Sequence, residues 1–266
     1  MTTSLQLASI GYGAMARSLR DSLARSDAGI ALQACLLSPT STGGEDDGPT
    51  RFTDVDALIA AGPELVVECA THAAVRDTVP QLLGAGIDVI IVSIGALADP
   101  ATRARVEEAA RLGGARATAV AGAVGGLDAL RAAACAGLDE VAYVGRKPPG
   151  AWKGTPAEEL LDLDGLCTAR AFYQGSAAEA ARDYPRNANV CAAIALAGAG
   201  FEATRVTLVA DPDVRQNVHE IVAVGAFGRF SITLENQPLP QNPKTSWLAA
   251  LSVEQAVRRH FACLDV

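Results

Sequence analysis

Histidines are scarce in this chain, and one of them stands where it could exchange a proton. The sequence holds three, at positions 72, 219 and 260. His219 lies in Asn217-Val218-His219-Glu220-Ile221, a segment that we predict to be a central strand of the second half of the chain. An imidazole gains and loses a proton near neutral pH, so His219 could be a general acid or base. The same position equally suits a buried, hydrogen-bonded core histidine.

The other two histidines favour simpler explanations. His72 follows a predicted strand and could be catalytic, but we expect it to cap the helix that comes next. His260 stands near the carboxyl end of the chain, and we expect it to face solvent.

A glycine-rich turn near the N-terminus has the spacing of a dinucleotide site. The segment 11–16 reads Gly-Tyr-Gly-Ala-Met-Ala, a G-x-G-x-x-A pattern between a predicted strand and a predicted helix. Gly11 permits the tight turn, Gly13 lets the backbone approach a pyrophosphate, and Ala16 lets the helix pack closely. The start of the helix offers free N–H groups to the phosphates. We therefore expect cofactor contacts from Gly11, Tyr12, Gly13, Ala14 and Met15.

The ends of later strands bear on which dinucleotide binds. Ser38 follows the second predicted strand, where an acidic residue would bind the ribose 2′-hydroxyl of NAD. Ser38 does not repel a 2′-phosphate, and no arginine is adjacent to attract one, so we expect both NAD and NADP to be accepted. Ala70 and Thr71 end the third strand, and small residues there leave room for the nicotinamide riboside.

These residues must be positioned by a sheet, and the first half of the chain alternates strands with helices. The expected strands are Leu5–Ile10, Ile30–Leu37, Leu65–Ala70, Asp88–Ser93 and Arg116–Ala121. The expected helices are Met15–Arg25, Asp54–Ala61, Ala73–Leu83 and one that begins at Pro100. Apolar strands separated by helices indicate a parallel sheet covered on both faces.

The pattern changes after Gly122. Helices are expected at Leu127–Ala136, Ala177–Arg182, Asn187–Ala199 and Ser252–Phe261. Strands are expected at Glu140–Lys147, Thr204–Ala210, Val218–Ala226 and Arg229–Leu234, with Phe227-Gly228 as a hairpin link, and a proline-rich loop at Gln237–Pro243. The segments Asp46–Pro49 and Lys147–Pro156 are expected to be exposed loops.

The fold class is therefore α/β, with an N-terminal Rossmann domain and a C-terminal α+β domain whose sheet is mainly antiparallel. The predicted domains are residues 1–122 for dinucleotide binding and 123–246 for catalysis and dimerisation. Residues 247–266 are expected to form a helix that packs back on the Rossmann domain.

Composition excludes some functions. The net charge of −8 and the isoelectric point near 4.9 argue against nucleic acid and anionic membranes as partners. No signal peptide or membrane-spanning run is evident, so we expect a cytoplasmic protein. None of the six cysteines are spaced C-x-x-C, and we expect buried reduced thiols and no metal site.

Several segments together resemble the L-aspartate dehydrogenase family, whose architecture is similar to that of homoserine dehydrogenase and dihydrodipicolinate reductase. Together with the glycine motif, these segments cover nearly the whole chain. They are Gly122–Asp128, Arg146–Pro149, Tyr184–Val190, His219–Ile221 and Glu235–Ser246. The resemblance implies that His219 is the active-site histidine and that Ala123 and Asn189 contact the nicotinamide cofactor. It also implies reversible conversion of L-aspartate to oxaloacetate and ammonia by way of iminoaspartate, which some members supply to NAD synthesis.

That substrate has two carboxylates, which need cationic or N–H partners. The loop Lys244-Thr245-Ser246 is our leading candidate, and Lys147 and Arg186 are weaker ones. We expect a homodimer. Two alternatives stay open: another reductase or dehydrogenase of similar fold, such as a dihydrodipicolinate reductase-like enzyme, and a non-catalytic NAD(P)-binding sensor.

Overall fold

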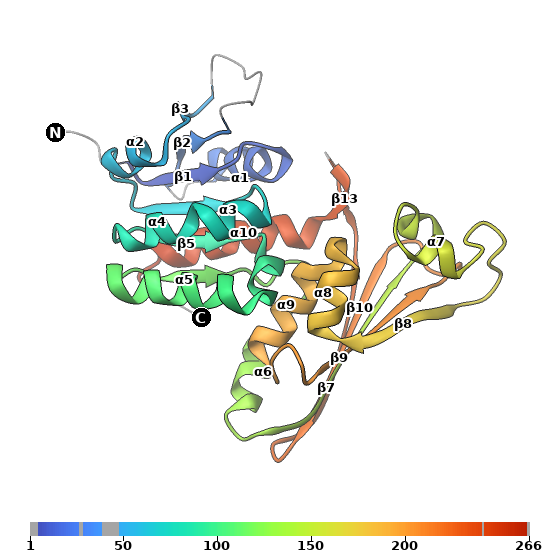
Figure 1. Cartoon of the computed structure of the whole chain (residues 1–266). Coiled ribbons are helices and arrows are strands. Elements are labelled where there is room, and N and C mark those ends of the chain that lie inside the picture. Colours follow the sequence, from blue (N-terminus) through green and yellow to red (C-terminus); the bar gives the residue numbers. More distant parts are fainter. Residues whose placement is uncertain (1–4, 27–28, 39–47, 241, 265–266) are drawn as a thin grey trace. The chain divides into compact units, whose positions relative to one another are not determined.

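A computed structural model of the protein describes residues 5–26, 29–38, 48–240 and 242–264 (Figure 1). The chain forms two units, one of residues 1–120 with 250–266 and the other of residues 121–249. None of the described helices is long and apolar enough to cross a bilayer.

The first unit is built on a six-stranded sheet in the order β3-β2-β1-β4-β5-β6, with every pairing parallel. This is the strand order of a Rossmann fold, in which the carboxyl ends of β1 and β4 flank the point where the order reverses. The strands are β1 (Leu7–Ile10), β2 (Leu32–Leu36), β3 (Thr50–Phe52), β4 (Leu65–Glu68), β5 (Asp88–Ile91) and β6 (Ala117–Ala119).

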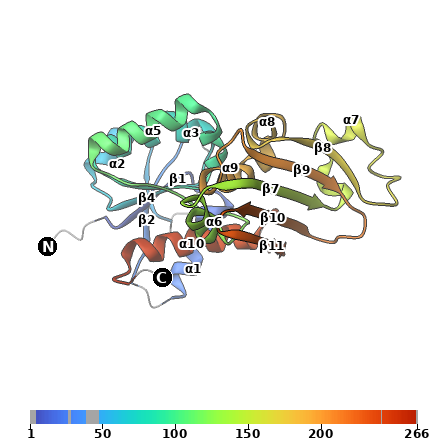
Figure 2. The same ribbon diagram turned by 90° about the horizontal axis from the view of Figure 1, so that it is seen from below.

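Helices cover both faces of this sheet, as its apolar strands require (Figures 1 and 2). On one face lie α3 (His72–Asp77), α4 (Val79–Gly84) and α5 (Pro100–Gly113), with α2 (Val55–Ala60) near α4. On the other lie α1 (Ala14–Ala24) and α10 (Trp247–Phe261). Val253 and Val257 of α10 are fully buried in the same core as Leu7 and Leu19.

The second unit contains a five-stranded sheet in the order β11-β10-β7-β9-β8. Its strands are β7 (Leu138–Lys147), β8 (Arg170–Ser176), β9 (Thr204–Ala210), β10 (Asn217–Gly225) and β11 (Gly228–Asn236). Of the pairings described within this second sheet, only β7–β9 is parallel, so the sheet is mainly antiparallel, as predicted. Figure 2 shows α8 (Ala177–Asp183) and α9 (Ala188–Ala197) along one face, and α6 (Leu127–Ala134) packs on α9.

Some local predictions were wrong. The expected helix 73–83 is two helices, because Pro80 in the first turn of α4 has no N–H to continue the ladder from α3. The strands β3 and β8 were not predicted. The proline-rich loop contains β12 (Pro238–Leu239) and β13 (Asn242–Ser246), and α10 begins five residues before Ser252.

Turns and loops also differ from expectation. Gly225 pairs with Gly228, so the hairpin loop is Ala226-Phe227 rather than Phe227-Gly228. The segment Lys147–Pro156 is not a wholly exposed loop, because it forms a 3-10 turn whose Trp152 is buried. Residues 46–47 of the other expected loop lie outside the described residues.

The cysteines are divided between the interior and the surface. Cys35 and Cys191 are buried and Cys69 is half-buried, as a core role predicts, whereas the remaining cysteines are exposed: Cys135, Cys167 and Cys263. The expectation of buried thiols is wrong for these three.

Candidate active site

The glycine turn is shaped to admit a phosphate. Gly11 has φ of +82°, and a Cβ there would lie 3.1 Å from the Cβ of Ala70, so only glycine fits. Gly13 begins α1 without a side-chain cap, and among the described residues no heavy atom lies within 4 Å of where its Cβ would be. The start of α1 therefore has space beside Gly13 and no N-cap side chain bound to its N–H groups. These residues fit the pyrophosphate of a dinucleotide.

Tyr12, between the two glycines, lies next to two arginine side chains. The guanidinium carbons of Arg17 and Arg20 each lie 5.7 Å from the centre of its ring, and Arg20 also donates to its hydroxyl. Arg20 is paired with Asp21 at 2.8 Å. Positive charge beside the helix N-terminus adds to the attraction for an anionic ligand.

Glu68 fastens the carboxyl ends of β4 and β5. It is fully buried, and its carboxylate accepts from the N–H of Ala70 at 2.8 Å, the N–H of Ser93 at 2.8 Å and the hydroxyl of Ser93 at 2.9 Å. Burial raises the pKa of Glu68, and these hydrogen bonds oppose that rise. The sequence signal for this role is a carboxylate at the end of the apolar run Leu65–Glu68.

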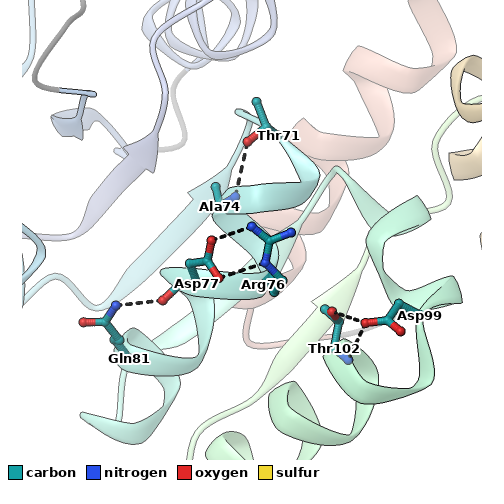
Figure 3. A network of polar contacts seen from close by, with 7 residues as sticks. All are labelled: Thr71, Ala74, Arg76, Asp77, Gln81, Asp99 and Thr102. Carbon is teal, nitrogen blue, oxygen red and sulfur yellow. Dashed lines mark hydrogen bonds and ion pairs between the residues drawn. The ribbon is translucent and has the colours of Figure 1, made fainter.

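The loop after β4 carries two of the predicted cofactor residues, Ala70 and Thr71. The hydroxyl of Thr71 accepts from the N–H of Ala74 at 3.2 Å and so caps α3 (Figure 3). The prediction that His72 caps this helix was wrong, since His72 is the exposed first residue of α3. Ser38, the predicted ribose contact, is exposed two residues after β2.

In Figure 3 the same capping chemistry recurs on α5, where the carboxylate of Asp99 accepts from the N–H and hydroxyl of Thr102 at 2.9 and 2.6 Å. Below Thr71, Arg76 and Asp77 form an exposed pair at 2.8 Å. Short caps of this kind fix where each helix begins relative to the strand end that precedes it.

His219 is buried in the second unit beside a tyrosine. It lies on β10, is 3% exposed, and its Nδ1 is 2.8 Å from the hydroxyl oxygen of Tyr143 on β7. The two rings are stacked, with centroids 6.0 Å apart and planes inclined by 17°. In the antiparallel register His219 is opposite Gly145, and Tyr143 is opposite Ile221.

Gly145 makes that contact feasible. A Cβ at Gly145 would lie 2.6 Å from the Tyr143 hydroxyl oxygen, closer than packed atoms allow. Because Gly145 has no side chain, the Tyr143 ring lies along β7 over it and brings the hydroxyl to the neighbouring strand. Neither Tyr143 nor Gly145 was picked out from the sequence, since their contact depends on the strand register.

A lysine is held close to this histidine. Lys147 donates to the Oδ1 of Asn187 at 2.6 Å, and its ammonium nitrogen lies 4.8 Å from the centre of the Trp152 ring. Burial, and to a smaller extent the positive charge of Lys147, together lower the pKa of His219 to about 4. The imidazole is therefore neutral at neutral pH.

Two titratable groups at the Tyr143–His219 pair are also uncharged, Tyr143 itself and Cys191, which interacts with Tyr143. Burial raises the pKa of the Cys191 thiol to about 12, and burial raises the pKa of Tyr143 well above its ordinary value. His219 is thus a neutral imidazole among neutral groups with one cation beside them. A pKa near 4 means that this imidazole does not titrate near neutral pH, contrary to the expectation from the sequence. The site suits an anionic substrate and hydrogen bonding by a neutral imidazole.

The predicted Ala123 loop lies against the strand next to His219. The carbonyl of Ala123 accepts from the side-chain amide of Asn236 at 2.6 Å. A Cβ on Gly125 would lie 3.5 Å from the side chain of Leu234, and Leu234 is the residue opposite His219 on β11. Asn189, the other residue implied for the cofactor, is exposed in the first turn of α9.

The predicted substrate loop is described in part. Thr245 accepts from the side-chain amide of Asn242 at 3.0 Å. The Ser246 hydroxyl oxygen is buried and has no hydrogen-bond partner within the described part of the chain. An unpartnered buried hydroxyl is costly, and a ligand could satisfy it. The side chains of Lys244 and Arg186 lie outside the described residues.

His260, unlike His219, has no part in either group of residues. Its Nδ1 is 3.7 Å from a carboxylate oxygen of Asp88, and its ring meets that of Phe261 edge to face, both in the first unit.

A Rossmann unit with an open glycine turn, and an α+β unit with a buried neutral histidine, define a dinucleotide-dependent oxidoreductase. Residues 11–119 match the NAD binding domain of homoserine dehydrogenase, and residues 128–260 match the C-terminal domain of aspartate dehydrogenase. The chain belongs to the L-aspartate dehydrogenase family.

Individual relatives agree with this assignment. The chain is 44% identical over 258 residues to an L-aspartate dehydrogenase of Polaromonas sp., covering 95% of this chain and 96% of that one. It is 48% identical over 204 residues to that of Pseudomonas aeruginosa, covering 77% and 76%. The crystal structure of aspartate dehydrogenase from Thermotoga maritima is 26% identical, with a TM-score of 0.76 over 98% of this chain and 99% of that one.

Proposed function

We propose that this chain is an NAD(P)-dependent L-aspartate dehydrogenase. It oxidises L-aspartate to iminosuccinate and hydrolyses the imine to oxaloacetate and ammonia, and it also runs in reverse. The observation that carries the proposal is the buried, neutral His219 beside the Lys147 cation. It lies inside the segment that matches aspartate dehydrogenases. A sensor that only binds coenzyme needs no such group.

The coenzyme, when bound, supplies the hydride acceptor at its nicotinamide ring. We assign the pyrophosphate to the glycine turn and the adenosine ribose to Ser38. The exposed position of Ser38 and the absence of a carboxylate there support acceptance of both NAD and NADP. The proposed cofactor residues are Gly11, Tyr12, Gly13, Ala14, Met15, Ser38, Ala70, Thr71, Ala123 and Asn189.

His219 is the proposed catalytic residue. Loss of hydride from Cα leaves a protonated imine, and addition of water to that imine moves protons from oxygen to nitrogen. A neutral imidazole at the reacting centre serves these steps by exchanging a proton or a hydrogen bond with the amine or the water.

The two substrate carboxylates need separate partners. We propose Lys244, Thr245 and Ser246 for one of them, supported by the unpartnered hydroxyl of Ser246. Lys147 is a candidate for the other, because its charge lies beside His219 rather than in solvent.

A substrate panel tests this function. Oxidation of NADH and of NADPH would be followed with oxaloacetate plus ammonia, with pyruvate or 2-oxoglutarate plus ammonia, and with dihydrodipicolinate. We expect oxaloacetate with ammonia to be the best pair. His219→Ala should lower its turnover by roughly 10²–10⁴-fold. The matched control His260→Ala, in the first unit beside Asp88, should leave turnover near normal.

Three outcomes would contradict the proposal. Coenzyme binding without turnover of any dicarboxylate would favour a sensor, and faster turnover of another oxo acid or of dihydrodipicolinate would change the substrate. Near-normal turnover in His219→Ala would remove the role given to that residue.

We also propose that the protein is a cytoplasmic homodimer. The face of the β7–β11 sheet opposite His219 carries the half-buried side chains of Val144, Val222 and Val224, which suit pairing across a two-fold axis. Light scattering after size-exclusion chromatography should give twice the 27.3 kDa of the chain, and a monomer mass would contradict the dimer.

A further inference from the structure

The hydroxyl of Tyr143 and the Nδ1 of His219 share one hydrogen. Both side chains are buried, at 1% and 3% exposure, and their atoms are 2.8 Å apart. Two arrangements fit this distance. Either the hydroxyl donates to a bare Nδ1, or an Nδ1–H donates to the hydroxyl oxygen. The first leaves the imidazole hydrogen on Nε2, and the second leaves Nε2 as a lone pair.

The burial of Tyr143 decides between them. Within the described part of the chain, the contact with His219 is the one hydrogen bond of the Tyr143 side chain. If Nδ1–H donated, the phenolic hydrogen would be buried without an acceptor, which is unfavourable. If the hydroxyl donates, both atoms are satisfied.

The charged and titratable groups near the Tyr143–His219 pair favour a neutral imidazole, and the tautomer itself follows from the Tyr143 hydrogen bond. Lys147 on β7 opposes a positive imidazole, and Cys191 on α9 and Tyr143 itself are uncharged. None of these groups supplies a negative charge that would favour an imidazolium with hydrogens on both nitrogens.

We propose that Tyr143 is a positioning residue, which holds His219 as the neutral tautomer with its hydrogen on Nε2. In this state the imidazole offers an N–H donor to the reacting centre. The identification of that centre rests on the proposed function. There His219 donates a hydrogen bond to oxygen, either the carbonyl oxygen of oxaloacetate or the hydroxyl oxygen of the carbinolamine, and stabilises negative charge that develops on it.

The chain contains a matched control for this arrangement. Tyr143-Val144-Gly145 on β7 and Tyr173-Gln174-Gly175 on β8 have the same spacing, and in both the tyrosine hydroxyl lies over the glycine. A Cβ on Gly175 would be 2.5 Å from the Tyr173 hydroxyl oxygen. The Tyr173 hydroxyl is buried and has no hydrogen-bond partner among the described residues. Tyr173→Phe therefore removes a similar hydroxyl that touches no imidazole.

Nitrogen-15 NMR of the full chain labelled in histidine reads the tautomer without substrate. We expect wild-type His219 at pH 7 to carry its proton on Nε2 and to show an unprotonated, hydrogen-bonded Nδ1. In Tyr143→Phe the Nδ1 signal should lose the shift caused by the hydrogen bond, and Gly145→Ala, which displaces the hydroxyl, should follow it. Tyr173→Phe should keep the wild-type pattern. A protonated Nδ1 in the wild type, or an unchanged Nδ1 signal in Tyr143→Phe, would overturn the proposal.

Kinetics supply a second readout. Tyr143→Phe should lower kcat for oxaloacetate and ammonia by roughly tenfold or more, while KM changes much less, because misorientation acts on the reacting centre. Tyr173→Phe should leave both constants near wild type. Equal constants in the two variants would overturn the positioning role. A wrong substrate assignment would instead appear as an inactive wild type with the tautomer result intact.

Discussion

At the residue scale, the burial of His219 has a measurable effect on stability. Its folded-state pKa of about 4 lies below the ordinary histidine value of 6.5, so between these values the unfolded chain binds a proton that the folded chain does not. The contribution of this residue to stability is therefore complete above pH 6.5 and decreases as the pH falls to about 4. The full loss is about 3 kcal/mol.

Replacement of His219 by glutamine should remove that pH dependence. Urea unfolding at pH 7 and at pH 4.5 would be measured for wild type and His219→Gln. We expect the wild type to lose more stability than the variant between these two pH values, by about 2–3 kcal/mol. His260→Gln, at a partly exposed histidine, is the control. Equal losses in wild type and His219→Gln would show that the imidazole is not buried as described.

Residues of the site differ in how well the sequence reveals them. His219 stood out because histidines are rare and because its surroundings resemble one family. Tyr143 and Gly145 did not stand out, because the contact of Tyr143 with the next strand depends on the strand register. Glu68 did not stand out either, because its hydrogen bonds to the N–H groups of Ala70 and Ser93 depend on the conformation of the loops after β4 and β5.

At the element scale, the first sheet was predictable because its strands are apolar runs separated by amphipathic helices and glycine turns. Short or polar strands were missed. Every expected strand of the first unit is present, with ends that differ by no more than two residues. The strand β8 was missed because Arg170-Ala-Phe-Tyr-Gln-Gly-Ser alternates poorly, and its Phe172 and Tyr173 are stabilised by packing on Tyr184. Tertiary contacts outweigh local pattern in such strands.

The helix α10 gives a test of element packing. Val257 is fully buried in the core of the Rossmann unit, and Glu254 of the same helix accepts from Ser22 of α1 at 2.6 Å. Val257→Ala should destabilise the protein by about 2 kcal/mol, from lost burial and the cavity left behind. Gln255→Ala, at an exposed position of the same helix, should change stability little.

Urea denaturation of the full chain measures both variants. The account of α10 as part of this core would fail if Val257→Ala and Gln255→Ala were equally stable, because a helix that only rests on the surface would tolerate either change.

At the scale of the whole molecule, the two units divide the chemistry between them. The first unit carries the glycine turn and Glu68, which is hydrogen-bonded to Ala70 and Ser93. The second unit carries His219 with Tyr143 and Lys147. The fold class followed from the sequence because the parallel and antiparallel patterns differ so clearly along the chain. The substrate did not follow from these patterns, because a Rossmann fold hosts many reactions, and it came from the family resemblance alone.

The central claim is that His219 acts at the carbon that exchanges hydride with the nicotinamide. A crystal structure of the protein with NAD⁺ and succinate, an unreactive four-carbon diacid, tests this most directly. We predict Nε2 of His219 within about 2.6–3.2 Å of the diacid or of a water bound to it. We also predict nicotinamide C4 within about 3–3.5 Å of a carbon of the diacid. A diacid bound away from His219, or an imidazole enclosed by hydrocarbon with no ligand beside it, would contradict the account.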